Sequence, residues 1–267
     1  RRFRSGVLSL EVAAGHGTGE GGEAAWLLVD VIPREPWVGQ ATTLRTRLVQ
    51  RSTFAEDPQY VPPSATGFWS EPPSTPESYY ATSRGERVLV TETRARLFPL
   101  AAGDATIGEA IAQVRVGGGV DDPFGWPLGR AHQPLALRSA PVTVRVRALP
   151  GGAPAGYGGA VGEFVARWTV DRARTTLDVP LMITLEVRGV GNLPLVRAPE
   201  LRPEGFELFA STSEDSAAAP GGPGLGLRSF RWTALARGTG TRSLALPGFS
   251  WFDPERAAYR SGEASSF

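Results

Sequence analysis

Hydrophobic and polar residues alternate in short segments along most of the chain, which is the pattern of β strands with one buried face. Residues 26–31 and 87–98 are rich in strand-forming side chains, and every second residue of 181–187 is aliphatic. No segment keeps a 3.6-residue apolar period, so we expect very little helix. Short strands separated by turn signals predict an all-β fold of antiparallel β-sandwiches.

Several other segments are expected to be strands because their apolar residues share one face. In the second half of the chain, Trp168 and Trp232 fall in phase with such residues and are predicted to be core side chains. We expect a turn at Gly189–Asn192 and a mobile hairpin loop at 211–226, which is small, polar and rich in Gly and Pro. The expected strand faces are Leu44/Thr46/Leu48, Val142/Val144/Val146, Phe164/Ala166/Trp168/Val170 and Phe206/Leu208/Ala210.

A repeated signature joins a serine-containing corner to an alternating strand. It occurs at 4–12 and 138–146 and begins again at 259–262. The modules also share a glycine turn followed by an apolar anchor, with Gly103 before Ile107 and Gly240 before Leu244. Repeats of this kind indicate an architecture of copied units. We therefore expect two whole sandwich modules, the first preceded by the closing strand of another module and the second cut within its own last strand.

The predicted domain boundaries follow from this repeat and from two linkers rich in glycine or proline. Residues 1–23 are expected to hold the closing strand of a preceding module and a Gly-rich linker. Residues 24–148 form the first sandwich, 149–160 a Pro/Gly linker, and 161–267 the second sandwich. A lone strand at 4–12 would expose unpaired backbone, so we expect it to be disordered or captured by a sheet edge.

Composition limits the function without naming it. The net charge of +1 gives no electrostatic basis for binding nucleic acid or an anionic membrane surface. Cysteine is absent, which excludes disulfides and thiolate metal sites. No apolar stretch reaches the roughly 18–20 residues that a membrane-spanning helix needs. Any membrane anchor is therefore expected in segments outside this sequence.

Six sequence segments, in this order and spacing, resemble the BatD family of aerotolerance, or oxygen-tolerance, proteins. The most specific is Leu149-Pro150 followed by Gly159-Ala160-Val161-Gly162-Glu163-Phe164, which is similar to a junction in that family. The likeness covers most of residues 24–267, and the sequence departs from the pattern at Ala236, where the first module has Pro99. The other segments are 67–71, 97–99, 187–193, 199–206 and 252–254.

The resemblance implies two tandem immunoglobulin-like antiparallel β-sandwich domains on the periplasmic or extracellular face of a bacterial membrane. It also implies a membrane anchor outside this fragment, and a link to oxygen or stress tolerance and to a system of MoxR-type ATPases and von Willebrand factor A-domain membrane proteins. Those membrane or extracytoplasmic proteins are the expected partners. The family supplies no catalytic residues to carry over.

The search for chemistry in the sequence finds no reactive constellation. His16 and His132 lack neighbouring ligands at metal-binding spacing, and no G-x-S-x-G elbow is present. Asp121 and Asp122 are the best acidic pair. They suit a turn in which Asp caps backbone N–H groups better than a Ca²⁺ site, which needs more oxygen ligands. We expect no enzyme activity, no cofactor and no metal.

We therefore expect a non-enzymatic protein–protein interaction module that uses loops and strand edges. The candidate loops are 117–133 and 211–226, and the candidate surface residues in the first are Asp121, Asp122, Phe124 and Trp126. Two alternatives remain open. Both loops can be passive spacers, with Trp126 packed into its own module, or exposed indoles can form a carbohydrate-binding platform for cell-wall glycan.

Overall fold

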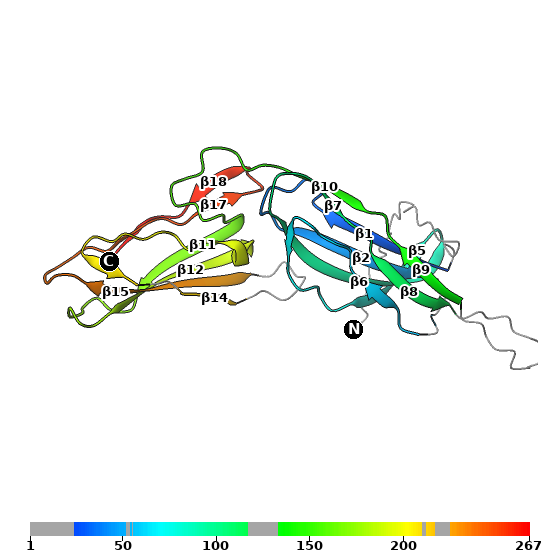
Figure 1. Ribbon diagram of the computed structural model, residues 1–267, viewed down its shortest axis with the longest axis horizontal. Helices are drawn as coiled ribbons and strands as arrows, with labels where there is room; N and C mark the ends of the chain where they lie inside the picture. Colours follow the sequence, from blue (N-terminus) through cyan, green and yellow to red (C-terminus); the bar gives the residue numbers. More distant parts are fainter. Residues whose placement is uncertain (1–23, 52–53, 55, 117–132, 210–211, 217–224) are drawn as a thin grey trace, which may run out of the picture. The chain divides into compact units, whose positions relative to one another are not determined.

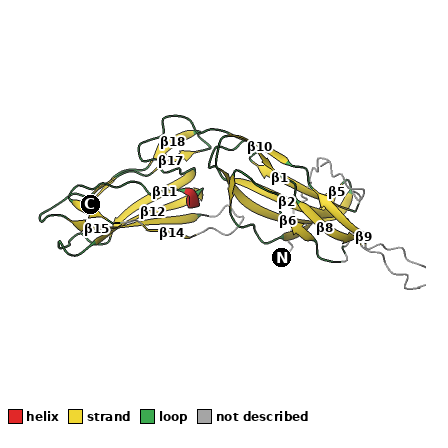
Figure 2. Ribbon diagram, viewed as in Figure 1, coloured by secondary structure: helices red, strands yellow, loops and turns green. Residues whose placement is uncertain are grey.

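The all-β fold that the sequence predicts is confirmed. The structure is a computed structural model, drawn in Figure 1, and its regular elements are strands in antiparallel sheets (Figure 2). Among the described residues, the single helical element is the three-residue 3-10 turn η1 (Leu193–Leu195), so no helix there could cross a bilayer. The described residues are 24–51, 54, 56–116, 133–209, 212–216 and 225–267.

The chain divides into two compact units. Unit 1 holds the described residues of Arg1–Arg34, Thr42–Leu97 and Asp104–Arg145, and unit 2 holds Glu35–Ala41, Phe98–Gly103 and Val146–Phe267. Ten strands lie wholly or mainly in unit 1: β1 (Ala25–Ile32), β2 (Thr42–Gln50), β3 (Gln59–Val61), β4 (Phe68–Ser70), β5 (Glu77–Ser83), β6 (Glu86–Pro99), β7 (Gly103–Ile107), β8 (Ile111–Val116), β9 (Gln133–Arg138) and β10 (Val142–Val146). Nine lie in unit 2: β11 (Gly162–Val170), β12 (Leu181–Gly191), β13 (Phe206–Leu208), β14 (Thr212–Ser216), β15 (Gly226–Ala236), β16 (Ala245–Leu246), β17 (Ser250–Asp253), β18 (Ala258–Ser261) and β19 (Ser265–Ser266).

The main sheet of unit 1 has the order β1-β2-β6, and both β4 and β5 pair with the remaining edge of β6. A three-stranded sheet, β3-β8-β9, forms a second layer, and β7 pairs with β10. The two layers bury one apolar cluster, to which β1 contributes Ala25 and Leu27 and β8 contributes Ala112 and Val114. We call the sheet face in this cluster the inner face. A second cluster, with Val49, Val88 and Val90, lies on the opposite, outer face.

The main sheet of unit 2 has the same strand order as that of unit 1. It runs β11-β12-β15, and both β13 and β14 pair with the remaining edge of β15. Its inner face forms one large core in which Phe164, Trp168, Leu185, Phe230 and Trp232 are all buried. The two indole rings lie 5.4 Å apart between centroids, and the prediction that both are core side chains is confirmed.

The repeated signatures take equivalent places in the two units. In each, a long strand ends near a glycine turn, and the next short strand, β7 or β16, pairs with the strand that follows the serine corner, β10 or β19. An antiparallel hairpin lies between them, β8-β9 in unit 1 and β17-β18 in unit 2. The serine has a structural role: Ser139 accepts a hydrogen bond from the Ala110 N–H, and the Ser261 and Ser250 hydroxyls bond to each other.

The expected turn at Gly189–Asn192 is wrong, because β12 continues through Gly191. Gly189 and Gly191 are paired with Phe164 and Gly162 of β11. A Cβ on either glycine would collide with the Phe164 ring and with the β11 backbone. These glycines therefore allow an aromatic ring to lie across the strand pair, which is a packing requirement rather than a turn signal.

The expected loop at 211–226 is wrong in its first part. Thr212–Ser216 form β14, which pairs with β15 from Arg231 to Leu227. The sequence Thr-Ser-Glu-Asp-Ser has no apolar alternation because β14 is an edge strand with exposed side chains. Residues 217–224 lie outside the described part of the chain, as do the expected strand at 4–12 and the linker before residue 24.

Candidate functional site

The surface that the sequence predicts cannot be placed. Asp121, Asp122, Phe124 and Trp126 all lie outside the described residues, and so do the two histidines. Within the described ranges, no three His, Asp or Glu side chains gather as metal ligands. The functional site must therefore be sought in the cavities and polar clusters of the two units.

A comparison of equivalent rows on the two inner faces locates a candidate. In unit 2, neighbouring strands place Trp168, Leu185 and Phe230 side by side. Leu97 of β6 corresponds to Ala234 of β15 in the repeat, so the equivalent row in unit 1 contains Thr46 opposite Thr93, with Val29 beside Thr46. Small side chains thus stand where unit 2 has two aromatic rings and a leucine, and a sandwich built this way is not filled.

A groove of about 710 Å³ lies at this row in unit 1. Its volume falls within the range of pockets that bind small ligands or a few residues of a peptide. Threonine hydroxyls from two strands form its floor, and apolar side chains and carboxylates surround them. The described lining consists of Leu27, Thr46, Leu48, Gln50, Phe54, Glu56, Asp57, Pro58, Tyr60, Pro76, Thr91 and Thr93.

The groove exists because the second layer of unit 1 covers only part of the main sheet. The inner-face residues of β1 and the start of β2 are mostly buried, whereas Thr91 and Thr93 of β6 are half-exposed. Farther along the same face, Tyr80 of β5 is 63% exposed. The Ser78 and Thr91 hydroxyls bond to each other at 3.0 Å across β5 and β6. The uncovered face therefore presents both polar and apolar side chains, and water or a ligand can reach them.

One side of the groove is the short strand β3. The hydroxyl of Tyr60 donates to the Thr46 hydroxyl over 3.2 Å, which connects the second layer to the floor. Partial burial raises the pKa of Tyr60 above its ordinary value, although the bond to Thr46 opposes the change. The phenol therefore stays neutral at physiological pH and acts as a hydrogen-bonding and packing group.

The ionisable residues on the lip of the groove are acidic. Glu56 pairs with Arg115 of β8 at 3.0 Å, and both side chains are more than half exposed. Asp57 has no ion-pair partner among the described residues and is exposed. No arginine is among the described lining residues. The groove is thus electrostatically suited to a positively charged group.

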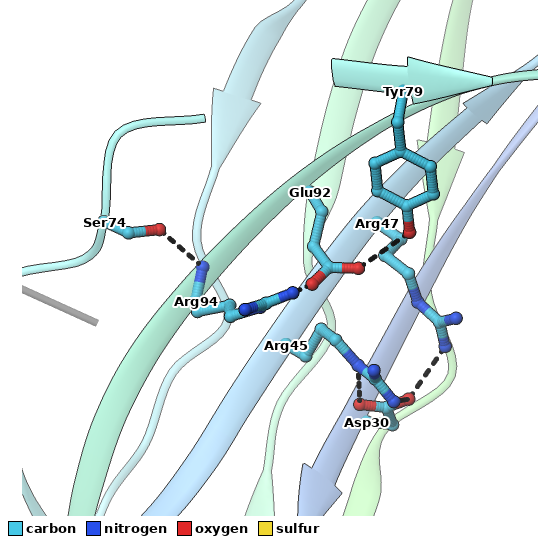
Figure 3. A network of polar contacts seen from close by, with 7 residues as sticks. All are labelled: Asp30, Arg45, Arg47, Ser74, Tyr79, Glu92 and Arg94. Atoms are coloured by element: carbon cyan, nitrogen blue, oxygen red, sulfur yellow. Dashed lines mark hydrogen bonds and ion pairs between the residues drawn. The ribbon is translucent and has the colours of Figure 1, made fainter. Parts of the chain in front are cut away.

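A polar network lies on the outer face of the same strands (Figure 3). Asp30 of β1 accepts two hydrogen bonds from Arg45, from Nε at 3.0 Å and from Nη2 at 2.9 Å. It also accepts one from Nη2 of Arg47 at 2.7 Å. This forked geometry is the strong form of an arginine–carboxylate pair, and it raises the pKa of Arg45 further above its ordinary value.

The second half of the network centres on Glu92 of β6, whose side chain is 3% exposed. Its carboxylate accepts the Tyr79 hydroxyl at 2.9 Å and Nε of Arg94 at 2.6 Å. Burial, and then the bond to Glu92, raises the pKa of Tyr79. Ser74 accepts the Arg94 backbone N–H (Figure 3). Every carboxylate here is held by a guanidinium, so the network suits cross-strand bracing rather than acid–base catalysis.

The network and the groove lie on opposite faces of β2 and β6, because successive strand residues point to opposite sides. Thr46 lies between Arg45 and Arg47, and Glu92 lies between Thr91 and Thr93. The ion pairs between β1 and β2, together with the Tyr79–Glu92 hydrogen bond between β5 and β6, therefore stiffen the floor of the groove from behind. A binding surface on braced strands keeps its shape better than one on loops.

Unit 2 has a larger cleft with a different character. It measures about 770 Å³ and is lined by the loop segments 172–178 and 238–242 together with Leu181, Phe206 and Ala236. Most of its loop side chains are exposed. Because loops hold a site less firmly than strands do, the groove of unit 1 is the better candidate.

The tryptophans give no sugar-binding platform among the described residues. Trp168 and Trp232 are buried, and the other described indoles are half-buried. Trp37 packs edge-on against Phe252 under Arg147, and Trp251 stacks on Phe249. Each of these rings is thus occupied by its own unit.

The sequence contains one signal for the groove that a closer comparison of the repeats detects. When Leu97 is aligned with Ala234, Thr93 takes the position that Phe230 has in the second repeat. The first repeat thus has a polar residue where a core residue is expected. Position alone does not tell whether a threonine faces a core or a cavity.

No protein-family model matches the sequence, and no curated protein matches it.

Proposed function

We propose that this chain is a non-catalytic, protein-binding β-sandwich module, and that the groove of unit 1 holds a segment of its partner. The observation that carries the proposal is the uncovered inner face of β6, where Thr91 and Thr93 line a groove of about 710 Å³. The described residues offer hydrogen-bonding groups and apolar contacts there but no nucleophile with a base. Such a surface is suited to binding and positioning a partner rather than to catalysing a reaction on it.

The resemblance to BatD proteins supports an extracytoplasmic setting for this binding, on the periplasmic or extracellular face of a bacterial membrane. Partners would then be membrane or extracytoplasmic proteins, including von Willebrand factor A-domain proteins, in a system linked to oxygen or stress tolerance. A glycan-binding function is less well supported, since none of the six described indoles is exposed.

Site-specific photocrosslinking in the cells that produce the protein tests this proposal. Tyr80 is on the uncovered face, two residues along β5 from Ser78, which pairs with Thr91. Its side chain is 63% exposed, so the larger p-benzoylphenylalanine can replace it without entering the core. We expect a discrete adduct whose partner peptide can be mapped by mass spectrometry. The adduct should disappear when Thr93→Trp fills the groove.

The control places the same crosslinker at Val165 of β11, which is 73% exposed in unit 2. An exposed residue far from the groove in sequence reports nonspecific crosslinking to abundant proteins. Identical adducts from Tyr80 and Val165, or an adduct that persists with Thr93→Trp, would show that the groove holds no partner. An adduct to polysaccharide in place of protein would support the glycan alternative instead.

A further inference from the structure

We infer that the partner segment enters the groove as an added β strand beside β3, and that it carries an arginine or lysine directed at Asp57. This inference rests on the proposed function, because it specifies how the same groove is occupied and by which chemistry. Three features carry it: an unpaired strand edge, a vacancy of one strand width in the second layer, and an acidic lip.

The unpaired edge belongs to β3, the terminal strand of the β3-β8-β9 sheet. Gln59, Tyr60 and Val61 pair with β8 on one side, and no described residue forms a ladder with the other side. All three residues are exposed, Val61 to 53%. An edge with free N–H and C=O groups beside exposed apolar side chains is a template for another strand.

The position of that edge places an added strand inside the groove. Tyr60 of β3 lies over β2, because its hydroxyl bonds to Thr46. The neighbour of β2 in the main sheet is β6. Strands are about 4.8 Å apart in any sheet, so one more strand beyond β3 would lie over β6. Its inward side chains would meet Thr91 and Thr93, which are the half-exposed residues of the floor.

The floor favours particular inward side chains. Thr91 and Thr93 offer methyl and hydroxyl groups together, and β-branched or threonine partners pack well on such a surface. Apolar contacts are available from Phe54 and Leu48, which line the same space. An extended segment that alternates small apolar or hydroxyl residues with polar ones therefore matches the groove better than a helix, whose diameter of about 10 Å exceeds one strand width.

The negative charge of the lip favours a partner segment that carries positive charge. Glu56 and Asp57 are the carboxylates among the described lining residues, and no basic side chain accompanies them there. Arg115 already neutralises Glu56, whereas Asp57 has no ion-pair partner among the described residues. A cationic side chain on the added strand would complete this pair, and an acidic segment would be repelled.

A displayed library of random decapeptides, selected on the whole chain, tests the inference. Peptides that bind the chain but not its Thr93→Trp variant define the groove ligands. We expect these sequences to be enriched in Arg and Lys and to alternate β-branched with polar residues. Asp57→Asn should weaken them roughly two- to fivefold, the size of an exposed ion pair, while the matched control Asp178→Asn in unit 2 should leave affinity unchanged.

Backbone methylation of a selected peptide tests the added strand itself. N-methyl groups on the residues that face β3 should weaken binding roughly fivefold for each lost hydrogen bond, and N-methyl groups on the alternate residues should have little effect. Groove ligands that lack basic residues and tolerate both methylation patterns would overturn the inference and leave the proposed function standing. Failure to select any peptide sensitive to Thr93→Trp would contradict the proposed function itself.

Discussion

Unit 1 and unit 2 share a strand order but fill their sandwiches differently. The row Trp168, Leu185 and Phe230 closes the core of unit 2, whereas the equivalent row in unit 1 has Thr46 and Thr93 and opens into a groove. The strand order needs only alternation and turns in the right places. Side-chain volume then decides whether a unit is a closed structural module or one with a site.

The outer faces of the two main sheets also differ, in how far their ion pairs are buried. In unit 1, Asp30 and Glu92 are held in a half-buried to buried network. The corresponding face of unit 2 has exposed pairs, such as Arg188 with Glu186 and Arg231 with Glu214. The unit with the open inner face is therefore the one whose sheet is braced from outside. We interpret this bracing as compensation for core contacts that unit 1 lacks.

The largest effect is expected when unit 2 is given the side chain of unit 1. Phe230→Thr removes a fully buried ring from the row beside Trp168 and should lower the free energy of unfolding by about 3–5 kcal/mol, as other large-to-small core changes do. Chemical denaturation followed by tryptophan fluorescence measures it. Thr93→Ala, the matched change in unit 1, should cost less than about 1 kcal/mol. Equal losses would mean that the two rows are packed alike.

A smaller difference is expected between the outer faces. Glu92→Gln keeps the volume of the side chain but removes the charge that Tyr79 and Arg94 share, which should cost about 1–3 kcal/mol of unfolding free energy. Glu186→Gln, its control in unit 2, breaks an exposed pair and should change stability by no more than about 0.5 kcal/mol. If the control destabilises the protein as much as Glu92→Gln, the network does not brace unit 1.

A pH-dependent contribution is expected from the β17-β18 hairpin of unit 2. Asp253 accepts the N–H groups of Glu255 and Arg256 at 3.1 Å and Nη1 of Arg256 at 2.7 Å. Burial alone would raise the pKa of Asp253, but these bonds outweigh it and hold the pKa below 3.8. The contribution is therefore complete above the ordinary pKa and is lost as pH falls through the folded value.

Thermal melts across pH measure this contribution. Asp253→Asn should lower the melting temperature by a constant amount from about pH 5 upward, and the difference from wild type should shrink as the medium is acidified below that point. A difference that grows on acidification would show that the folded pKa of Asp253 is raised rather than lowered.

The smallest effect on stability is expected when unit 1 is given the side chain of unit 2. Thr93→Phe places a ring in the groove without displacing core atoms, so the free energy of unfolding should change by less than about 1 kcal/mol in either direction. Calorimetry measures it. Destabilisation beyond about 2 kcal/mol would be the sign of overpacking, and the space beside Thr93 would then be smaller than the groove requires.

The all-β fold could be predicted because strands depend on local signals. Alternation of apolar and polar residues identified β2, β10 and β12. Local sequence signals gave a wrong prediction where a residue has a structural role that is unusual for its type. Gly189 makes room for the Phe164 ring, and Thr212–Ser216 form an edge strand without an apolar face.

Comparing the repeats marks Thr93 as a polar residue at a core position, but the sequence does not predict the groove itself, because the groove depends on which residues the second layer leaves uncovered. Thr91 and Thr93 alternate like core positions, and only the short second layer leaves them half-exposed. The network has the same origin: Asp30 meets Arg45 through strand register over a distance of 15 residues in the chain. The residues that the sequence favoured instead, Asp121, Asp122, Phe124 and Trp126, stay predictions because they lie outside the described residues.

The most direct test of the groove is NMR of threonine methyl groups during addition of a peptide selected on the whole chain. Thr46, Thr91 and Thr93 report the floor of the groove, and Thr184 and Thr233 report the outer face of unit 2 as internal controls. We expect the methyl signals of Thr91 and Thr93 to shift strongly and saturably while those of Thr184 and Thr233 stay unchanged. Saturable binding that shifts only the unit 2 signals, or leaves Thr91 and Thr93 unmoved, would contradict the claim that the open sandwich of unit 1 is the binding site.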